Sequence, residues 1–342
     1  MPNHSDVLLV GSVPAASAEA VFRLLAKELG NRAKRYPDGE TGERINWIRW
    51  QKHAFDANPG LALFDAEVKL PGYKDTLKRP FYRIRARDQV KFGSLRFAEA
   101  AIESYAVFKR LKDQGVVPRA TRFQVSIPTA VALLSGFVVK EDRAAVEPAL
   151  EAAMARELTQ IGAAIPASEL SIQWDVCMEV LGLDGGFDLH FGNVVDETVA
   201  RLKRLNAPAP AGAEIGIHLC YGDPGHKHIQ EPKDLATSVK FANAICAGSG
   251  RPIAWVHMPV PRGRTDEEYF APLKDLRTPK DTEIYLGLVH FTDGLPGTTQ
   301  RIKVAETFLP RFGLATECGL GRRDPTTIAP LLGVHRQASE AA

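Results

Sequence analysis

Short apolar runs recur along the chain, and most are followed by a segment with helical spacing. The runs are rich in β-branched residues and are often apolar on both faces, as the buried strands of a parallel sheet are. They lie at 6–13, 33–39, 121–128, 171–177, 214–220, 252–260, 283–290 and 313–320. Eight such runs alternating with helices predict a (β/α)8 TIM barrel.

The segments between the runs carry the signals of helices. Residues 17–30 place apolar side chains on one helical face, with Ser17 and Gly30 as the predicted caps. The segments 142–165, 196–205 and 234–248 follow the same pattern. A doubly wound open sheet is the alternative α/β fold, but no GxGxxG motif follows the first apolar run to favour it.

One segment does not fit the alternation of strands and helices. Residues 78–93, KRPFYRIRARDQVKFG, place Arg83, Arg85 and Arg87 at period two. We predict a β-hairpin here, inserted between early elements of the barrel. Its arginines form either a solvated strand face or an anion-binding rim near the barrel mouth.

Composition narrows the class of protein. A chain of 342 residues suits one TIM-barrel domain over residues 1–342, with the hairpin as an insertion. The net charge of +2 gives no attraction to nucleic acid or to an anionic membrane. We find no signal peptide and no apolar stretch near the ~20 residues of a membrane span. The four cysteines are far apart in a large chain, which predicts a reduced, cytoplasmic protein without a disulfide framework.

Candidate metal ligands lie where strands are expected to end. Catalytic groups of a TIM barrel sit at the carboxyl ends of its strands. His218 and Cys220 end one run, and because residues i and i+2 of a strand face the same side, both can bind one ion. Cys318 ends the last run and faces the same mouth. Imidazole and thiolate are zinc ligands, although His and Cys are also common in protein cores.

Five short motifs occur in order along nearly the whole chain. They are VGSVP at 10–14, DGE at 38–40, IQWDVCME at 172–179, HLCYGD at 218–223 and ECGLGRRD at 317–324. Together they resemble the catalytic barrel of cobalamin-independent methionine synthase, in the superfamily that also holds uroporphyrinogen decarboxylase. The resemblance implies a TIM barrel that binds zinc through His218, Cys220 and Cys318.

The resemblance also implies a substrate site. That family holds an amino-acid thiol through its ammonium and carboxylate groups, and the matching positions here are Ser12, Glu40 and Asp175. The chain departs from the family on the sixth strand, where the family's fourth zinc ligand is a glutamate and the residue in register is His257. We therefore predict His257 as the fourth ligand, the alternatives being a supporting group beside the metal or an acid–base.

The leading functional hypothesis is zinc-dependent transfer of a methyl or other alkyl group to a small thiol. Asp175 orients the thiol in this scheme, and His290 joins it as the predicted acid–base. A zinc-dependent lyase or hydrolase is the second hypothesis, and a metal-free decarboxylase or a binding protein of the same fold is the third. The expected substrates are the thiol and an alkyl donor, whose identities the sequence leaves open. The expected assembly is a homodimer.

Overall fold

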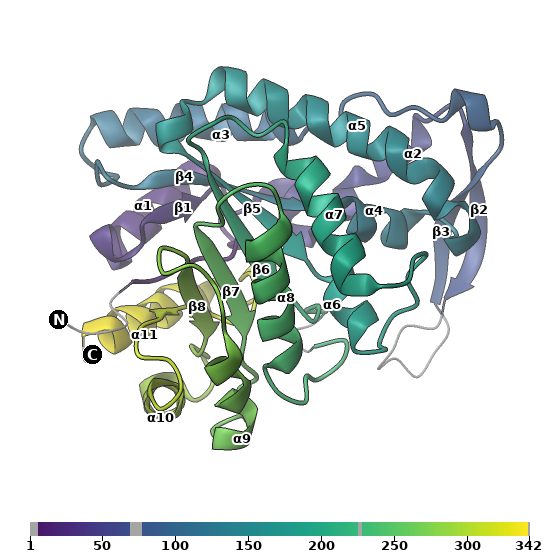
Figure 1. Ribbon diagram of the computed structural model, residues 1–342. Helices are drawn as coiled ribbons and strands as arrows, with labels where there is room; N and C mark the ends of the chain where they lie inside the picture. The colour runs from purple at the N-terminus through teal and green to yellow at the C-terminus, as the bar shows by residue number, and fades with distance from the viewer. Residues whose placement is uncertain (1–5, 69–76, 225–227, 341–342) are drawn as a thin grey trace.

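The structure, a computed structural model, describes residues 6–68, 77–224 and 228–340. Within these ranges seven parallel strands form a curled, half-barrel sheet in which spatial order follows chain order (Figure 1). The strands are β1 (Arg35–Pro37), β4 (Arg122–Pro128), β5 (Leu170–Val176), β6 (Glu214–Leu219), β7 (Trp255–Pro259), β8 (Glu283–Gly287) and β9 (Gly313–Leu314).

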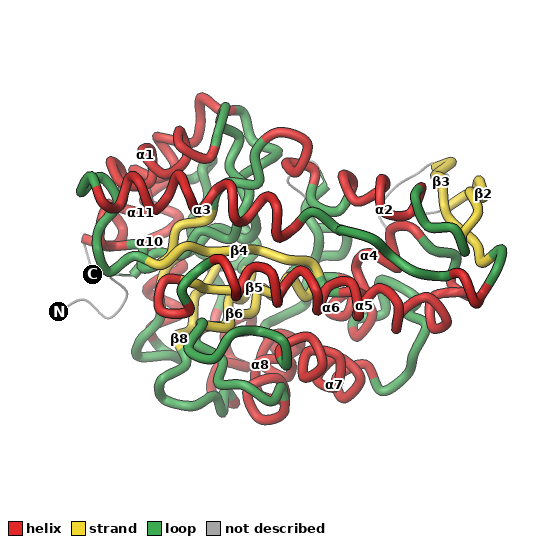
Figure 2. The backbone as a smooth tube through the Cα atoms, turned by 90° about the horizontal axis from the view of Figure 1, so that it is seen from above, coloured by secondary structure: helices red, strands yellow, loops and turns green. Residues whose placement is uncertain are grey.

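Helices cover the outer side of the sheet, and the two ends of the described chain lie close together (Figures 1 and 2). The predicted cap Ser17 accepts a hydrogen bond from the backbone N–H of Ala20 at 3.3 Å. None of the helices in the described ranges is long and apolar enough to cross a membrane. The helices are α1 (Ala18–Glu28), α2 (Lys52–Asp56), α3 (Phe97–Asp113), α4 (Ala130–Phe137), α5 (Lys140–Ala164), α6 (Met178–Leu183), α7 (Val194–Asn206), α8 (Ala236–Gly248), α9 (Glu267–Phe270), α10 (Gly294–Glu306) and α11 (Ile328–Glu340).

The first apolar run, 6–13, does not form the regular strand that the sequence predicts. Val7 makes isolated parallel bridges to Ala33 and to Leu314, the latter in β9 at one edge of the sheet. The described residues therefore form a seven-stranded half-barrel with this run along it, and the complete eight-stranded barrel of our prediction is not confirmed.

The reason is that side chains take the carbonyl groups that a strand ladder would use. Gln124 of β4 donates to the carbonyl of Leu9 at 2.9 Å. Gln173 of β5 donates to the carbonyl of Val10 at 2.5 Å, and the Ser126 hydroxyl donates to the same oxygen at 3.1 Å. These bonds hold the run against β4 and β5, next to the positions where the site residues stand.

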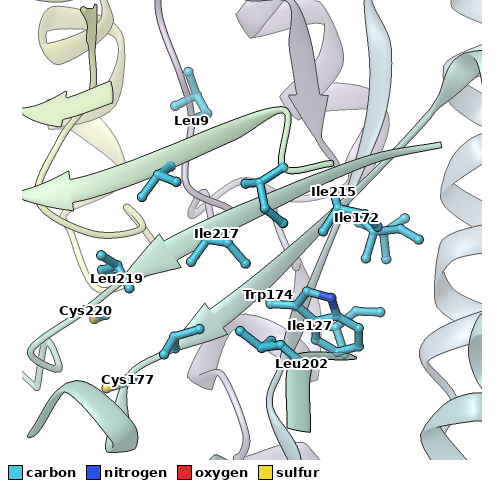
Figure 3. Packing of buried hydrophobic residues seen from close by; sticks show 14 of the residues in the cluster. Leu9, Ile127, Ile172, Trp174, Cys177, Leu202, Ile215, Ile217, Leu219 and Cys220 are labelled. Carbon is cyan, nitrogen blue, oxygen red and sulfur yellow. The ribbon is translucent and has the colours of Figure 1, made fainter. Parts of the chain in front are cut away.

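Apolar packing fixes the direction of β5 and β6, whose carboxyl ends carry the site. Every residue of β5 is buried. Trp174 of β5 packs beside Leu202 of α7 in the hydrophobic core. Ile217 and Leu219 of β6 belong to the same core (Figure 3). The Trp174 indole N–H donates to Asn206 at 2.8 Å, so its polar atom is satisfied in the core.

The hairpin insertion is present, but its boundaries are not those that the sequence suggests. The antiparallel pair is β2 (Leu61–Val68) with β3 (Leu77–Ile84), and it projects from the sheet (Figures 1 and 2). Within the segment 78–93 only residues 78–84 are strand. The strand that pairs with them is β2, which precedes the segment in the chain and does not lie inside it. The Arg83 guanidinium lies 5.3 Å from the Phe64 ring centre and 3.9 Å from Asp142, so it does not face the cavity described below.

A buried ion pair joins α5 to α7 and provides a test of the packing. Glu147 accepts from Arg201 at 2.6 and 2.9 Å and from His190 at 3.1 Å. Burial by itself would raise the pKa of Glu147, but these hydrogen bonds outweigh it and lower the pKa to about 2. A carboxyl with a lowered pKa stabilises the fold above its ordinary pKa, and the contribution is lost as the pH falls toward 2.

We expect Glu147→Ala to lower the free energy of unfolding by about 3 kcal/mol at pH 7, because it leaves a buried guanidinium short of a partner. Urea unfolding followed by circular dichroism measures the change. Glu151→Ala is the matched control, since Glu151 pairs with the half-exposed Arg204 of the same two helices, and its expected cost is below about 1 kcal/mol. Equal costs for the two variants would contradict the prediction, as would a Glu147 effect that does not shrink in acid.

Candidate metal centre

Three metal-binding side chains meet at the carboxyl ends of the strands. His218 lies near the end of β6, Cys220 directly follows that strand, and Cys318 lies in the loop after β9. Their ligand atoms all fall within 4.8 Å of one another. The Sγ atoms of Cys220 and Cys318 are 3.7 Å apart, and Cys318 Sγ is 3.7 Å from His218 Nε2.

These separations fit a tetrahedral metal site. Zinc binds thiolate sulfur at about 2.3 Å and imidazole nitrogen at about 2.0–2.1 Å, so tetrahedral geometry places two sulfurs about 3.8 Å apart and a sulfur and a nitrogen about 3.6 Å apart. The chain thus holds Cys318 at nearly the required distances from both Cys220 and His218. Three protein ligands leave a fourth position open, as in catalytic zinc sites.

The loop after β6 supplies a hydrogen bond to the sulfur of Cys220. The backbone N–H of Gly222 donates to Cys220 Sγ at 3.2 Å. Gly222 has a φ of +75°, and a Cβ there would lie 2.6 Å from Cδ1 of Ile229, so the turn that aims this N–H requires glycine. A donor directed at the sulfur favours its charged form, but a hydrogen bond with Cys177 and burial outweigh it and raise the pKa of Cys220 well above its usual value.

His257 lies beside the cluster and is not part of it. Its Nδ1 is 2.8 Å from Nδ1 of His218, and its Nε2 is 2.9 Å from the carbonyl oxygen of Thr316. Burial lowers the pKa of His257 to about 4. Because protein partners engage both ring nitrogens, the arrangement does not fit our prediction of His257 as the fourth ligand and favours the supporting role that was its alternative.

A cavity of about 570 Å³ opens over the three ligands. Ser12, Glu40 and Asp175 line the same cavity, so the structure brings all three predicted substrate-binding residues together with His218, Cys220 and Cys318. The rest of the lining is largely apolar. It includes Trp47, Ile48, Phe137, Met178, Phe187 and Ile229. The cavity therefore offers a metal position, two carboxylates and an apolar wall to one ligand.

Glu40 and Asp175 share an environment that disfavours two negative charges. Part of the Glu40 surface is open to the cavity, but protein surrounds its carboxylate, and this burial, with Asp175 and Asp38 nearby, raises the pKa of Glu40 well above its usual value. Burial also raises the pKa of Asp175, despite hydrogen bonds from Gln173 at 2.9 Å and Trp47 at 3.2 Å. A bound cation would relieve this repulsion, so the pair could hold an ammonium group.

The backbone around Ser12 is packed tightly against this pair. A Cβ on Gly11 would lie 2.5 Å from the Glu40 carboxylate, so only glycine lets the carboxylate approach the chain here. The Ser12 hydroxyl accepts from the N–H of Gly321 at 3.2 Å, and the Ser12 carbonyl accepts from Leu320 at 2.7 Å. The first run of the chain is thereby tied to the loop that carries Cys318.

His290 lies outside the cavity. The strand β8 ends at Gly287, and the His290 ring turns toward the carbonyl of Val260, 2.9 Å from its Nε2. Its Nδ1 is 3.5 Å from Glu317, and burial lowers the pKa of His290 to about 3. The structure thus gives no route from His290 to a ligand in the cavity, and we do not retain it as an acid–base.

Sequence reasoning overlooked two residues that shape the site. Gln173 donates to both Asp175 and the Val10 carbonyl, and Trp47 donates to Asp175. Gln173 stands two residues before Asp175 in the same strand, so period-two alternation was the signal that could have found it. For Trp47 no local signal exists, because its partner is 128 residues away.

The fold and the cluster define an α/β protein with a His/Cys site able to hold a metal ion. No protein-family model matches the sequence, and no curated protein is significantly similar to it. The structure is similar to a B12-independent methionine synthase from Shewanella sp. W3-18-1, solved in complex with selenomethionine. The TM-score is 0.67 at 14% identity, over 99% of this chain and 98% of that chain.

A second similar structure is a protein from Listeria monocytogenes described as a vitamin-B12-independent methionine synthase. Its TM-score is 0.56 at 16% identity, over 95% of this chain and 86% of that chain. The resemblance that the five motifs suggested is therefore confirmed in three dimensions. At such low identity the likeness shows a shared fold.

Proposed function

We propose that this chain is a zinc-dependent enzyme that transfers a methyl or other alkyl group to a small amino-acid thiol. The observation that carries the proposal is the convergence of His218, Cys220 and Cys318 on one cavity with a buried pair of carboxylates. A thiol that also bears an ammonium group matches both features at once. Similarity of fold to methionine synthases supports the reaction class.

The residues of the cavity bind the substrate, and the metal site activates its thiol. Glu40 and Asp175 hold the ammonium group, and Gln173 and Trp47 keep the Asp175 carboxylate aimed at the cavity. The Ser12 hydroxyl, which lines the cavity, would bind the substrate carboxylate, and the apolar lining would keep water from the sulfur. Zinc, when bound, lowers the pKa of a coordinated thiol and keeps it as a nucleophilic thiolate at neutral pH.

The alternative reactions have less support from this geometry. A zinc lyase or hydrolase uses the same open metal position to activate water or a carbonyl. A second histidine in the metal shell would favour such chemistry, but protein groups engage both ring nitrogens of His257. A metal-free decarboxylase or a binding protein has no need of two thiols held 3.7 Å apart beside an imidazole.

A cobalt-substituted protein tests the substrate class directly. We expect homocysteine to change the visible spectrum of bound Co²⁺, because its sulfur enters the fourth position as its ammonium group meets Glu40 and Asp175. The matched control is 4-mercaptobutanoate, which keeps the thiol and the carboxylate but lacks the ammonium group, and which should bind at least about 10-fold more weakly. If a panel of thiols leaves the spectrum unchanged while a hydroxamate alters it, the hydrolase or lyase reading replaces ours.

A further inference from the structure

The buried imidazoles of His218 and His257 form one hydrogen-bonded relay. They belong to neighbouring strands, since His218 in β6 pairs in register with His257 in β7. Their Nδ1 atoms lie 2.8 Å apart, and the relay ends at the carbonyl of Thr316, 2.9 Å from His257 Nε2. The two residues are 2% and 0% exposed, so bulk water cannot replace either bond.

The carbonyl of Thr316, at the end of the relay, determines which ring nitrogens carry a hydrogen. A carbonyl oxygen only accepts, so Nε2 of His257 must carry a hydrogen. An imidazole with its one hydrogen on Nε2 presents a bare Nδ1 that accepts. Nδ1 of His218 must therefore donate, which leaves the lone pair of His218 on Nε2. That nitrogen is the one 3.7 Å from Cys318 Sγ.

The same relay reaches the loop that carries the other ligand. Thr316 stands two residues before Cys318, and its hydroxyl donates to the Cys318 carbonyl at 2.8 Å. The carbonyl that accepts from His257 thus belongs to a segment that is itself held in place. One chain of bonds runs from His218 through His257 and Thr316 to Cys318.

We propose that His257 is a positioning residue: it fixes the tautomer and ring orientation of His218 and couples this ligand to the Cys318 loop. The inference rests on the proposed function in taking the three-residue cluster as the zinc site. His257 itself contacts neither metal nor substrate. Its effect is that Nε2 of His218 carries no hydrogen and faces Cys318 before a metal ion binds.

His257→Phe should weaken zinc binding about 10- to 100-fold, the effect usual for loss of the partner that orients a metal-ligating histidine. The phenyl ring fills the space but cannot accept, so the Nδ1–H of His218 loses its partner. His257→Asn should restore part of the affinity, because its amide oxygen can accept that hydrogen. Zinc affinity is measured by competition with a chromophoric chelator.

His335→Phe is the matched control. His335 is equally buried, has Nδ1 3.0 Å from the Leu331 carbonyl, and lies in α11 outside the cluster. Its replacement should leave zinc affinity unchanged. Thermal unfolding of each variant shows whether the fold survives.

Tautomers are read by nitrogen-15 NMR of histidine-labelled, metal-free protein. In the wild type we expect His218 as the Nδ1–H tautomer and His257 as the Nε2–H tautomer, and in His257→Phe both tautomers of His218. An Nε2–H tautomer of His218 in the wild type overturns the proposal even if no variant folds, and so does unchanged zinc affinity in a folded His257→Phe. The measurement needs neither metal nor turnover, so it stands or fails independently of the alkyl-transfer function.

Discussion

Cys220→Ser is expected to abolish zinc binding and, with it, alkyl transfer. The wild-type chain should carry about one zinc, as a site with these three ligands predicts. Loss of an outer hydrogen-bond partner alone costs about 10- to 100-fold in metal affinity, so loss of a thiolate ligand should cost more than about 100-fold. Cys318→Ser should behave in the same way, since its sulfur completes the triangle with Cys220 and His218. Metal analysis of the purified variants measures the effect.

Two other cysteines serve as controls. Cys246 lies on α8 as a free, half-buried thiol, and Cys246→Ser should retain full zinc. Cys177 lines the cavity near Cys220 (Figure 3) but is not one of the three converging residues, so Cys177→Ser should also retain it. If the folded wild-type protein binds no zinc when zinc is supplied, both the metal site and the proposed alkyl transfer are wrong.

Asp175→Asn is expected to reduce the affinity for homocysteine at least about 30-fold, because removal of one partner of a buried ion pair costs about 2 kcal/mol or more. The asparagine oxygen can still accept from Gln173, but its NH₂ group would face the indole N–H of Trp47 in place of an acceptor. Zinc content should not change, since Asp175 is not one of the cluster ligands. Isothermal titration of the zinc-loaded protein gives the affinity.

Comparison of homocysteine with 4-mercaptobutanoate distinguishes loss of recognition of the ammonium group from a general disturbance of the site. Binding of 4-mercaptobutanoate should change far less on Asp175→Asn, because it has no ammonium group for the carboxylate to hold. The preference of the wild type for the amino thiol should therefore shrink in the variant. If both thiols weaken equally, the carboxylate pair does not recognise an ammonium group, and its role is structural.

Local patterns in the sequence determined much of the scaffold and part of the site. Apolar runs of strand length predicted the seven parallel strands of the sheet at nearly their observed places, because burial on both faces requires such runs. Strand periodicity placed His218 and Cys220 on one side, since residues two apart in a strand point the same way. Cys318 followed from the rule that parallel strands end on one face.

Features that depend on distant partners were decided only by the tertiary structure. The run 6–13 looks like a strand, but side chains of Gln124 and Gln173, more than 100 residues away, take its carbonyls. The hairpin boundary depended on an upstream partner, β2. His257 has the right chemistry and position for a ligand. Whether its nitrogens face a metal or other protein groups depends on a carbonyl 59 residues further on. The nitrogen that donates to this carbonyl has no lone pair for a metal, and the other nitrogen already uses its lone pair to accept from His218.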